Sequence, residues 1–180
     1  MVIENLSLNG CFCENLKLIN DNRGSFIKIF SKSKIKEILP GFNPAEMYIT
    51  RSQKNVIRGM HFQIPPFDHG KIVVCLSGAV TDVLLDLRQG NGYGKVISRV
   101  LRSNEINTMY IPRGVAHGFL AHSDDTILAY VVETEYSQEH DRGILWSSIG
   151  FEWGADNPIV SQRDCDHPKL SEIKKYSWRI

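Results

Sequence analysis

The chain has 180 residues, 42% of them hydrophobic and 23% charged, so it can bury a sizeable core and has the composition of an ordinary globular protein. Its formal net charge of +1 provides no global attraction to nucleic acid or to an anionic membrane, and we expect neither as a partner. No apolar run reaches the roughly 18 residues that a membrane span needs.

The expected location is the cytoplasm. The first nine residues include Glu4 and lack the basic start and long apolar centre of a signal peptide. The four cysteines, at positions 11, 13, 75 and 165, form no C-x-x-C pair. We therefore expect reduced thiols rather than disulfides or a zinc site.

Short β-patterned runs dominate the chain. In order they are Asn15–Ile19, Ser25–Phe30, Glu46–Thr50, Asn55–His61, Ile72–Leu76, Val80–Leu87, Val96–Leu101, Thr108–Ile111, Gly118–Ala121 and Thr126–Thr134. Glycine, proline, asparagine and aspartate separate these runs, a pattern that favours a sandwich or a barrel. We expect one all-β domain over residues 1–180.

Few helices are predicted, all of them short. Ser33 is expected to cap a helix over Lys34–Leu39, which Pro40-Gly41 ends. The other two candidates are Ser137–Arg142 and Ser171–Lys175. The part of the chain after about residue 137 is less strand-like, and we expect it to pack over the barrel.

Three segments carry polar residues suited to chemistry. The first reads Arg58-Gly59-Met60-His61-Phe62-Gln63 and is followed by Lys71; the second runs from Pro112 to Phe119 and contains His117; the third is Ser161-Gln162-Arg163-Asp164. Histidine, lysine and arginine are rarely buried without partners. Their placement in or beside strands therefore predicts a polar barrel interior, which usually means a ligand site.

The second segment resembles the second cupin motif, P-x-G-x-x-H, but the metal ligands of the first motif are incomplete. That motif normally supplies H-x-H and then glutamate, whereas this chain reads His61-Phe62-Gln63 and has Lys71 nearby. Glutamine is a poor ligand for a transition metal, and an ammonium group repels a cation. We expect no metal, with a site built from His61, His69 and His117 as the alternative.

Many motifs in the right order make the chain similar to the dTDP-4-dehydrorhamnose 3,5-epimerase family, a metal-free branch of the cupins. The resemblance covers roughly Asn15 to Leu170. The matching stretches are Asp21 to Gly24, Arg51-Ser52, Val56 to Gln63, Gly70-Lys71, Asp82 to Arg88, Tyr93 to Lys95, Ile111 to Phe119, Tyr130, Glu139-His140, Arg142 to Ile144 and Pro158 to Asp164.

The resemblance implies a cupin jelly-roll β-barrel, a homodimer with an exchanged N-terminal strand, and no cofactor. It implies that His61 is the catalytic base, that Asp164 orients it, that Tyr130 is the opposed acid, and that Lys71 lies near the keto oxygen. It also implies substrate-binding positions, with arginines near the diphosphate: Arg23, Phe26, Arg58, Gln63 and His117.

These roles agree with the chemistry of a ketone. A hydrogen next to the carbonyl is acidic because the resulting anion delocalises onto oxygen. A neutral imidazole with a carboxylate behind it can remove that hydrogen near pH 7, and an ammonium group can stabilise the enolate. A second group, such as a tyrosine, must return the proton from the opposite face for the centre to invert.

The chain departs from the family where the nucleotide is held. Lys28 stands in place of a glutamate, Glu46 in place of a glutamine, Tyr48 in place of an asparagine, and Val131 in place of the lysine that follows the acid tyrosine. Guanine offers adjacent N–H donors that suit the Glu46 carboxylate. This pattern leaves dTDP, GDP and CDP open as the nucleotide, and a plain surface ion pair between Lys28 and Glu46 is the alternative.

The sequence thus predicts an epimerase that inverts carbon 3 and carbon 5 of a nucleotide-linked 4-keto-6-deoxy sugar, or of a related hexose or heptose, for a surface polysaccharide. Inversion at carbon 3 alone and ketone migration are alternatives on the same fold. More distant alternatives are a metal-dependent cupin enzyme and a cupin that only binds a sugar nucleotide.

Overall fold

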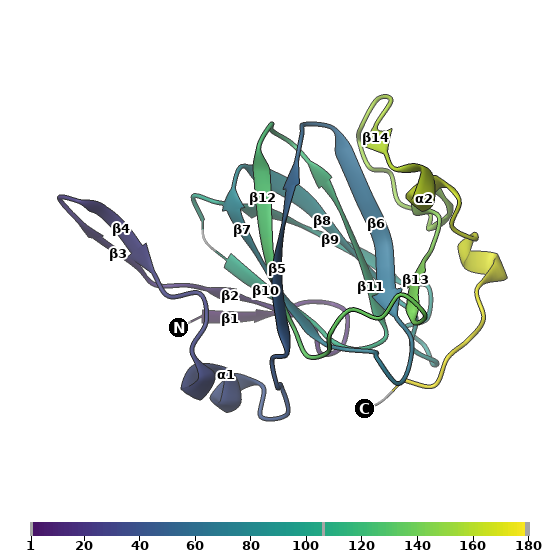
Figure 1. Cartoon of the computed structure of the whole chain (residues 1–180), viewed down its shortest axis with the longest axis horizontal. Helices are drawn as coiled ribbons and strands as arrows, with labels where there is room; N and C mark the ends of the chain where they lie inside the picture. The colour runs from purple at the N-terminus through teal and green to yellow at the C-terminus, as the bar shows by residue number, and fades with distance from the viewer. Residues whose placement is uncertain (1, 106, 179–180) are drawn as a thin grey trace.

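The computed structural model describes residues 2–105 and 107–178. Two six-stranded sheets lie face to face (Figure 1). The first contains, in spatial order, β1 (Val2–Asn5), β2 (Phe12–Asn15), β10 (Asn107–Ile111), β7 (Lys71–Ser77), β12 (Thr126–Val132) and β5 (Glu46–Ser52). The second contains β13 (Asp141–Gly143), β6 (Val56–Gln63), β11 (Val115–Ala121), β8 (Ala79–Asp86) and β9 (Val96–Arg102), with β14 (Ile159–Val160) parallel to β6.

The core between the sheets is built from residues on alternate positions of facing strands. Val73 and Leu128 from the first sheet join Val80, Leu84 and Phe119 from the second in one buried cluster. Alternation places every second side chain of a strand on this inner face. The double-sheet arrangement confirms the predicted cupin-type jelly roll.

The outer face of the second sheet is also covered, because the chain after β13 packs across it. Val83 and Leu85 of β8 contact a second apolar cluster that includes Ile149, Trp153 and Leu170. Burial on both faces explains why β8 and β11 read as nearly continuous apolar runs. It also agrees with the expectation that the C-terminal third packs over the barrel.

Helical structure is sparse. It consists of α1 (Lys32–Ile38), α2 (Gln162–Cys165) and two 3₁₀ turns, Trp146–Ser148 and Leu170–Glu172. Ser31, not Ser33, occupies the N-cap position of α1. None of the helices among the described residues is both long and apolar enough to cross a membrane.

Three of the predicted elements were wrong in part or in full. Ser137–Arg142 forms a turn that leads into β13, because Ser137 Oγ bonds His140 Nδ1 and the segment has no apolar stripe to bury. Ser171–Lys175 holds only the end of a 3₁₀ turn. The run Asn15–Ile19 is broken between β2 and β3.

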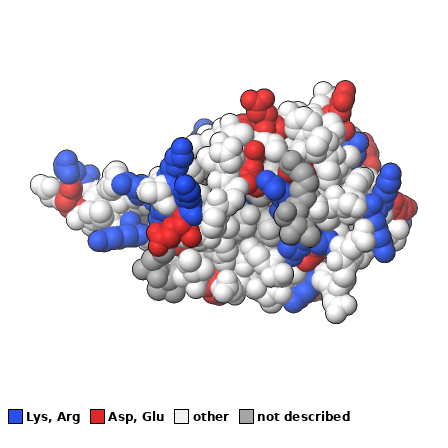
Figure 2. Space-filling model, turned by 90° about the horizontal axis from the view of Figure 1, so that it is seen from below, with Lys and Arg blue, Asp and Glu red and all other residues white. Residues whose placement is uncertain are grey.

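A β-hairpin of β3 (Leu18–Asp21) and β4 (Gly24–Ile27) extends away from the barrel (Figure 1). Phe26, which pairs with Ile19 in this hairpin, is 58% exposed. The last strand of the first sheet, β5, pairs with β12 on one side, and its outward side chains Met47 and Ile49 are exposed. On the face shown in Figure 2, acidic and basic side chains are interspersed on the barrel.

Candidate active site

Two adjoining cavities open between the sheets, an inner one of about 80 Å³ and an outer one of about 260 Å³. They share Tyr48, His61 and Lys71. The inner cavity is completed by Thr50, Arg58, His117, Phe119 and Tyr130. The outer cavity is completed by Glu46, Phe62, Gln63, His69, Val132, Thr134, Tyr136, Asp141 and Arg163.

His61 and Asp164 form a hydrogen-bonded pair at the edge of these cavities. His61 lies on β6, and its Nε2 is 2.8 Å from Asp164 Oδ1. The backbone N–H of Gly59 donates to the other carboxylate oxygen at 3.0 Å. Burial would raise the pKa of Asp164, but the hydrogen bonds from His61 and Gly59 outweigh it, so the pKa lies below its usual value. An ionised carboxylate favours the tautomer with the proton on Nε2, which leaves Nδ1 as a base.

Gly59 makes this pair possible because its backbone passes very close to β11. Its φ is +127°, and a Cβ at this position would lie 2.5 Å from Gly118 Cα. Only glycine adopts this conformation with so little space. The close approach aims the Gly59 N–H at Asp164 and holds the carboxylate behind the imidazole.

The floor of the inner cavity contains a second histidine–aspartate pair and a lysine. His117 Nε2 lies 2.5 Å from Oδ1 of Asp82, and both side chains are buried. Burial raises the pKa of Asp82 and lowers that of Lys71 to about 8. Lys71, on β7, thus places an ammonium group with a near-neutral pKa in the cavity that His61 borders.

Tyr130 lines the inner cavity from β12, on the sheet that faces the sheet of His61. Its ring stacks on Tyr48, with centroids 4.7 Å apart and planes 13° from parallel. Burial raises the pKa of Tyr130 well above its ordinary value, so the phenol holds its proton at neutral pH. An imidazole and a phenol therefore line one small cavity from opposite walls.

The sequence model of the dTDP-4-dehydrorhamnose 3,5-epimerase family matches residues 5–172. This chain belongs to that family. A curated dTDP-4-dehydrorhamnose 3,5-epimerase of Shigella flexneri is 35% identical over 158 residues, which cover 86% of this chain and 87% of the relative. The family assignment makes the protein an isomerase of the class that epimerises carbohydrates.

Solved structures of family members share the fold over nearly the whole chain. The dTDP-4-dehydrorhamnose 3,5-epimerase of Sulfolobus tokodaii has a TM-score of 0.91 at 30% identity, with 98% of each chain covered. The Legionella pneumophila dTDP-6-deoxy-D-glucose-3,5-epimerase, solved in complex with dTDP-4-keto-L-rhamnose, has a TM-score of 0.91 at 28% identity, with 96% of this chain and 94% of that chain covered.

Within this epimerase, the predicted residues on β5 and β6 all line the cavities. The side chains of Arg58 and Gln63, however, already form hydrogen bonds within the protein. Arg58 donates from Nε to Ser52 Oγ at 3.1 Å. The Gln63 amide nitrogen donates to the carbonyl of Phe67 at 3.1 Å, and its oxygen accepts from Ser137 N at 2.7 Å. Gln63 therefore holds two loops in place at the outer cavity.

Three of the predicted substrate-binding residues do not reach the cavities of their own chain. Arg23, Phe26 and Lys28 belong to or follow the projecting hairpin, and Arg23 pairs with Asp21. The alternative ion pair between Lys28 and Glu46 is absent from the described part of the chain. Glu46 instead accepts a hydrogen bond from the backbone N–H of Tyr136 at 2.8 Å.

Several residues of the outer cavity were not predicted. Tyr136 is 61% exposed at its rim, and its hydroxyl donates to Asp141 at 3.3 Å. Asp141 also forms an ion pair with Arg163. Of these residues, only Arg163 could have been predicted from the sequence, because it precedes Asp164 in the third segment. Tyr136 follows a strand and has no recognisable motif around it.

The alternative metal site of three histidines is not assembled. His117 bonds Asp82, and His69 Nδ1 lies 2.7 Å from Thr134 Oγ1. Among the described residues, the group with ligand atoms close enough for one ion is His61, Asp164 and His167, whose donor atoms lie within 4.8 Å of one another. His167 was not singled out from the sequence.

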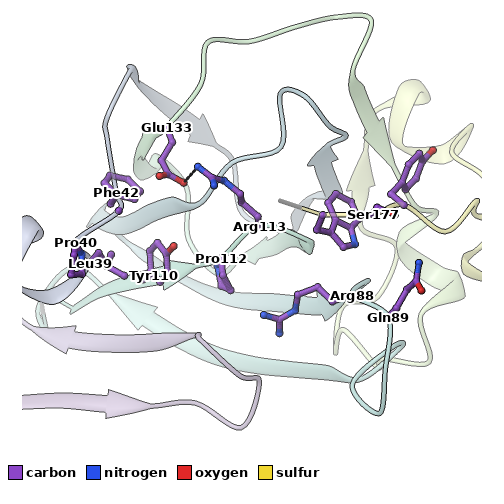
Figure 3. Close-up of a pocket in the computed structure, with 13 residues that line it drawn as sticks. Leu39, Pro40, Phe42, Arg88, Gln89, Tyr110, Pro112, Arg113, Glu133 and Ser177 are labelled. Atoms are coloured by element: carbon purple, nitrogen blue, oxygen red, sulfur yellow. Dashed lines mark ion pairs between the residues drawn. The ribbon is translucent and has the colours of Figure 1, made fainter. Parts of the chain in front are cut away.

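A separate cavity of about 560 Å³ lies between the segment that follows α1, Leu39 to Phe42, and the C-terminal segment (Figure 3). Its charged side chains are already paired: Arg113 Nη2 lies 3.0 Å from a Glu133 oxygen, and Arg88 binds Asp86. None of the predicted site residues lines it. The catalytic candidates therefore gather at the other cavities.

Proposed function

We propose that this epimerase inverts carbon 3 and carbon 5 of a nucleotide-linked 4-keto sugar by moving protons next to the ketone. The observation that carries the proposal is the placement of His61 and Tyr130 on facing sheets across one cavity, with Lys71 beside them. We further propose that residues 1–180 act as one domain, that no metal or cofactor takes part, and that the product supplies a surface polysaccharide.

The reaction divides into two proton transfers. Nδ1 of His61 removes the hydrogen from the carbon next to the ketone, and the electron pair moves onto the keto oxygen. The Lys71 ammonium group stabilises this enolate in a site from which water is largely excluded. Tyr130 then donates its phenolic proton to the opposite face of the carbon, which inverts the centre. Afterwards the His61 imidazolium releases its proton to solvent, and the Tyr130 phenolate takes one up.

The outer cavity is the proposed site of the nucleotide. Tyr136 presents an exposed aromatic face at its rim, and such a face can stack on a base. The names of the relatives favour dTDP. Glu46 favours guanine instead, because its carboxylate accepts from adjacent N–H donors.

Proton NMR in deuterated water tests the function directly. The purified chain would be incubated with dTDP-linked and GDP-linked 4-keto-6-deoxyhexoses, and with GDP-linked 4-ketoheptoses. Deuterium entering at both carbons with formation of the epimer supports the proposal and identifies the nucleotide. A complete lack of exchange with every 4-keto substrate would argue against it, and migration of the ketone would indicate the isomerase alternative.

We also propose that the active form is a homodimer in which each hairpin docks on the other subunit. The hairpin exposes Leu18, Ile19 and Phe26, and the edge strand β5 exposes Met47 and Ile49. An unpaired strand edge with apolar side chains invites another chain. Such docking would bring the partner's Arg23, Phe26 and Lys28 toward the outer cavity.

The dimer predicts a solution mass twice the 20.4 kDa of the chain at micromolar concentration. Ile49→Asp should shift the mass toward the monomer, because it places a charge in an apolar interface. Ile159→Asp is the matched control, since Ile159 is equally apolar and 57% exposed on β14. Light scattering coupled to size exclusion measures both, and a monomeric wild-type chain would contradict the proposal.

The lowered pKa of Lys71 predicts an alkaline loss of activity. With a pKa of about 8, its ammonium group is charged below that pH and neutral above it. Enolate stabilisation should therefore be lost as the pH rises through about 8, and kcat/KM for exchange should fall. Lys71→Arg should keep a charged group and move the alkaline fall in kcat/KM to higher pH. If the fall stays at the same pH in Lys71→Arg, another residue causes it.

A further inference from the structure

His167 lies directly behind the proposed base and takes no part in the mechanism above. Its Nε2 is 3.7 Å from Oδ1 of Asp164, the same oxygen that His61 Nε2 approaches at 2.8 Å. The two imidazole rings meet edge to face, with centroids 5.8 Å apart. Nε2 of His167 is buried and has no hydrogen-bond partner among the described residues. A buried nitrogen without a partner calls for an explanation, and a bound ion is one.

The position of this ring is built into the sheet. Gly143 on β13 lies opposite His61 in the strand pairing, and a Cβ at Gly143 would lie 2.1 Å from His167 Nε2. The missing side chain thus forms the slot that the imidazole occupies. The next residue is fixed as well, because the Pro168 carbonyl accepts a hydrogen bond from Leu145 N at 2.8 Å.

We propose that His61, Asp164 and His167 form a binding site for Zn²⁺, and that zinc bound there switches off the catalytic base. Two imidazoles and one carboxylate are a ligand set that zinc uses, with a fourth position for water. In tetrahedral coordination, donor atoms about 2.0–2.2 Å from zinc stand roughly 3.3 Å from one another. The 2.8 Å and 3.7 Å separations lie on either side of this value, and all three donor atoms lie within 4.8 Å of one another, so side-chain rotations can bring them to the spacing that zinc needs.

The inhibition follows from the tautomers of histidine, and this part rests on the proposed function. Without metal, Nε2–H of His61 donates to Asp164, and the lone pair of Nδ1 takes the substrate proton. A metal bound to Nε2 takes the lone pair of Nε2 itself, so in the neutral ring the proton must sit on Nδ1. The nitrogen that faces the substrate then has no free lone pair, and no proton can be removed.

The surrounding charges set the expected strength of binding. Arg163 lies near the cluster, but it is paired with Asp141. Lys71 borders the same cavity as His61 and carries positive charge below a pH of about 8. These cations oppose Zn²⁺, so we expect reversible micromolar binding rather than the tight binding of a structural zinc site.

Isothermal titration of the full-length, chelator-treated protein with ZnCl₂ tests the site without substrate. Wild type should bind about one zinc per chain, and His167→Leu should bind at least roughly tenfold more weakly. His167→Gln is a second variant in case leucine perturbs folding, with thermal melting as the check. Cys165→Ser and His122→Leu are controls that remove other zinc ligands, one of them on α2, and should bind as wild type does.

Inhibition is measured as deuterium exchange with and without zinc, each variant relative to its own metal-free rate. Wild type should lose at least tenfold in rate and recover with EDTA, while His167→Leu should resist the same zinc concentration. Absent binding in wild type, or equal binding in His167→Leu, would overturn the site. Binding that depends on His167 but leaves exchange unchanged would overturn the inhibition and weaken the role of His61 as base. Because calorimetry uses no substrate, failure of the site and failure of the reaction are separable.

Discussion

Replacing His61 with asparagine is expected to lower the rate of deuterium uptake next to the ketone by about 10²–10⁴-fold, the usual contribution of a general base. Asparagine places a polar group near the position of Nδ1 but has no basic nitrogen. The loss should appear at both carbons, since the cavity offers one base on this wall. Initial rates from proton NMR in deuterated water provide the measurement.

Asp164→Asn separates the base from the group that orients it. The amide keeps the shape of the carboxylate but loses its charge, and it can donate to Nε2, which favours the tautomer protonated on Nδ1. We expect a strong loss that still leaves more activity than His61→Asn retains.

His122→Asn is the control for His61→Asn, since His122 bonds Thr81 away from both cavities. Near wild-type exchange in His61→Asn would refute the assigned base.

The central strands were predictable because their local pattern and their burial agree. The buried positions of β12 form an apolar run that begins after the turn at Asp125. The apolar runs of β7 and β8 lie on either side of the turn at Ser77-Gly78. The site residues on these strands followed from recognisable motifs. His61, Lys71 and His117 are each surrounded by glycine or proline in fixed positions, and strand pairing brings them together.

The covering segments were harder to predict, because tertiary contacts rather than local patterns determine them. Nothing near β14 marks Ile159–Val160 as a strand; it forms by pairing in parallel with Val56 and Ile57 of β6. His167 was missed for a similar reason. Its proximity to His61 depends on the space left by Gly143, which only the three-dimensional structure reveals.

The hairpin of β3 and β4 shows a different limit of prediction from sequence motifs. Motif matching places Arg23 and Phe26 among the substrate-binding residues, yet the same chain carries them away from its own cavities (Figure 1). A sequence motif records which residues meet a ligand but not which copy of the chain supplies them. Because Phe26 and Ile49 are exposed, the solution masses of the wild type and of Ile49→Asp test whether a second copy of the chain supplies these residues.

Replacing Tyr130 with phenylalanine should separate proton exchange from inversion. The variant loses one oxygen, and the ring can stay stacked on Tyr48, so little structural change is expected. His61 can still remove the proton and return a deuteron to the same face, which gives exchange without epimerisation. Inversion should fall about 10²-fold or more, because the proton donor on the opposite wall is gone. Tyr110→Phe makes the same atomic change in the separate cavity and should leave both rates intact.

The same experiment decides how many centres the wild type inverts. Tyr130 must deliver a proton to carbon 3 and to carbon 5, and carbon 5 is more demanding because its bulky substituent has to swing to a new orientation. Tyr48 and Val131 flank Tyr130 in this chain, and a small displacement of the sugar at the reacting carbon can cost about 10²-fold. We expect deuterium at both carbons with the wild type and its correct substrate. Label confined to carbon 3 after long incubation would show a single epimerisation, and the assignment of His61 and Tyr130 would then apply to that carbon alone.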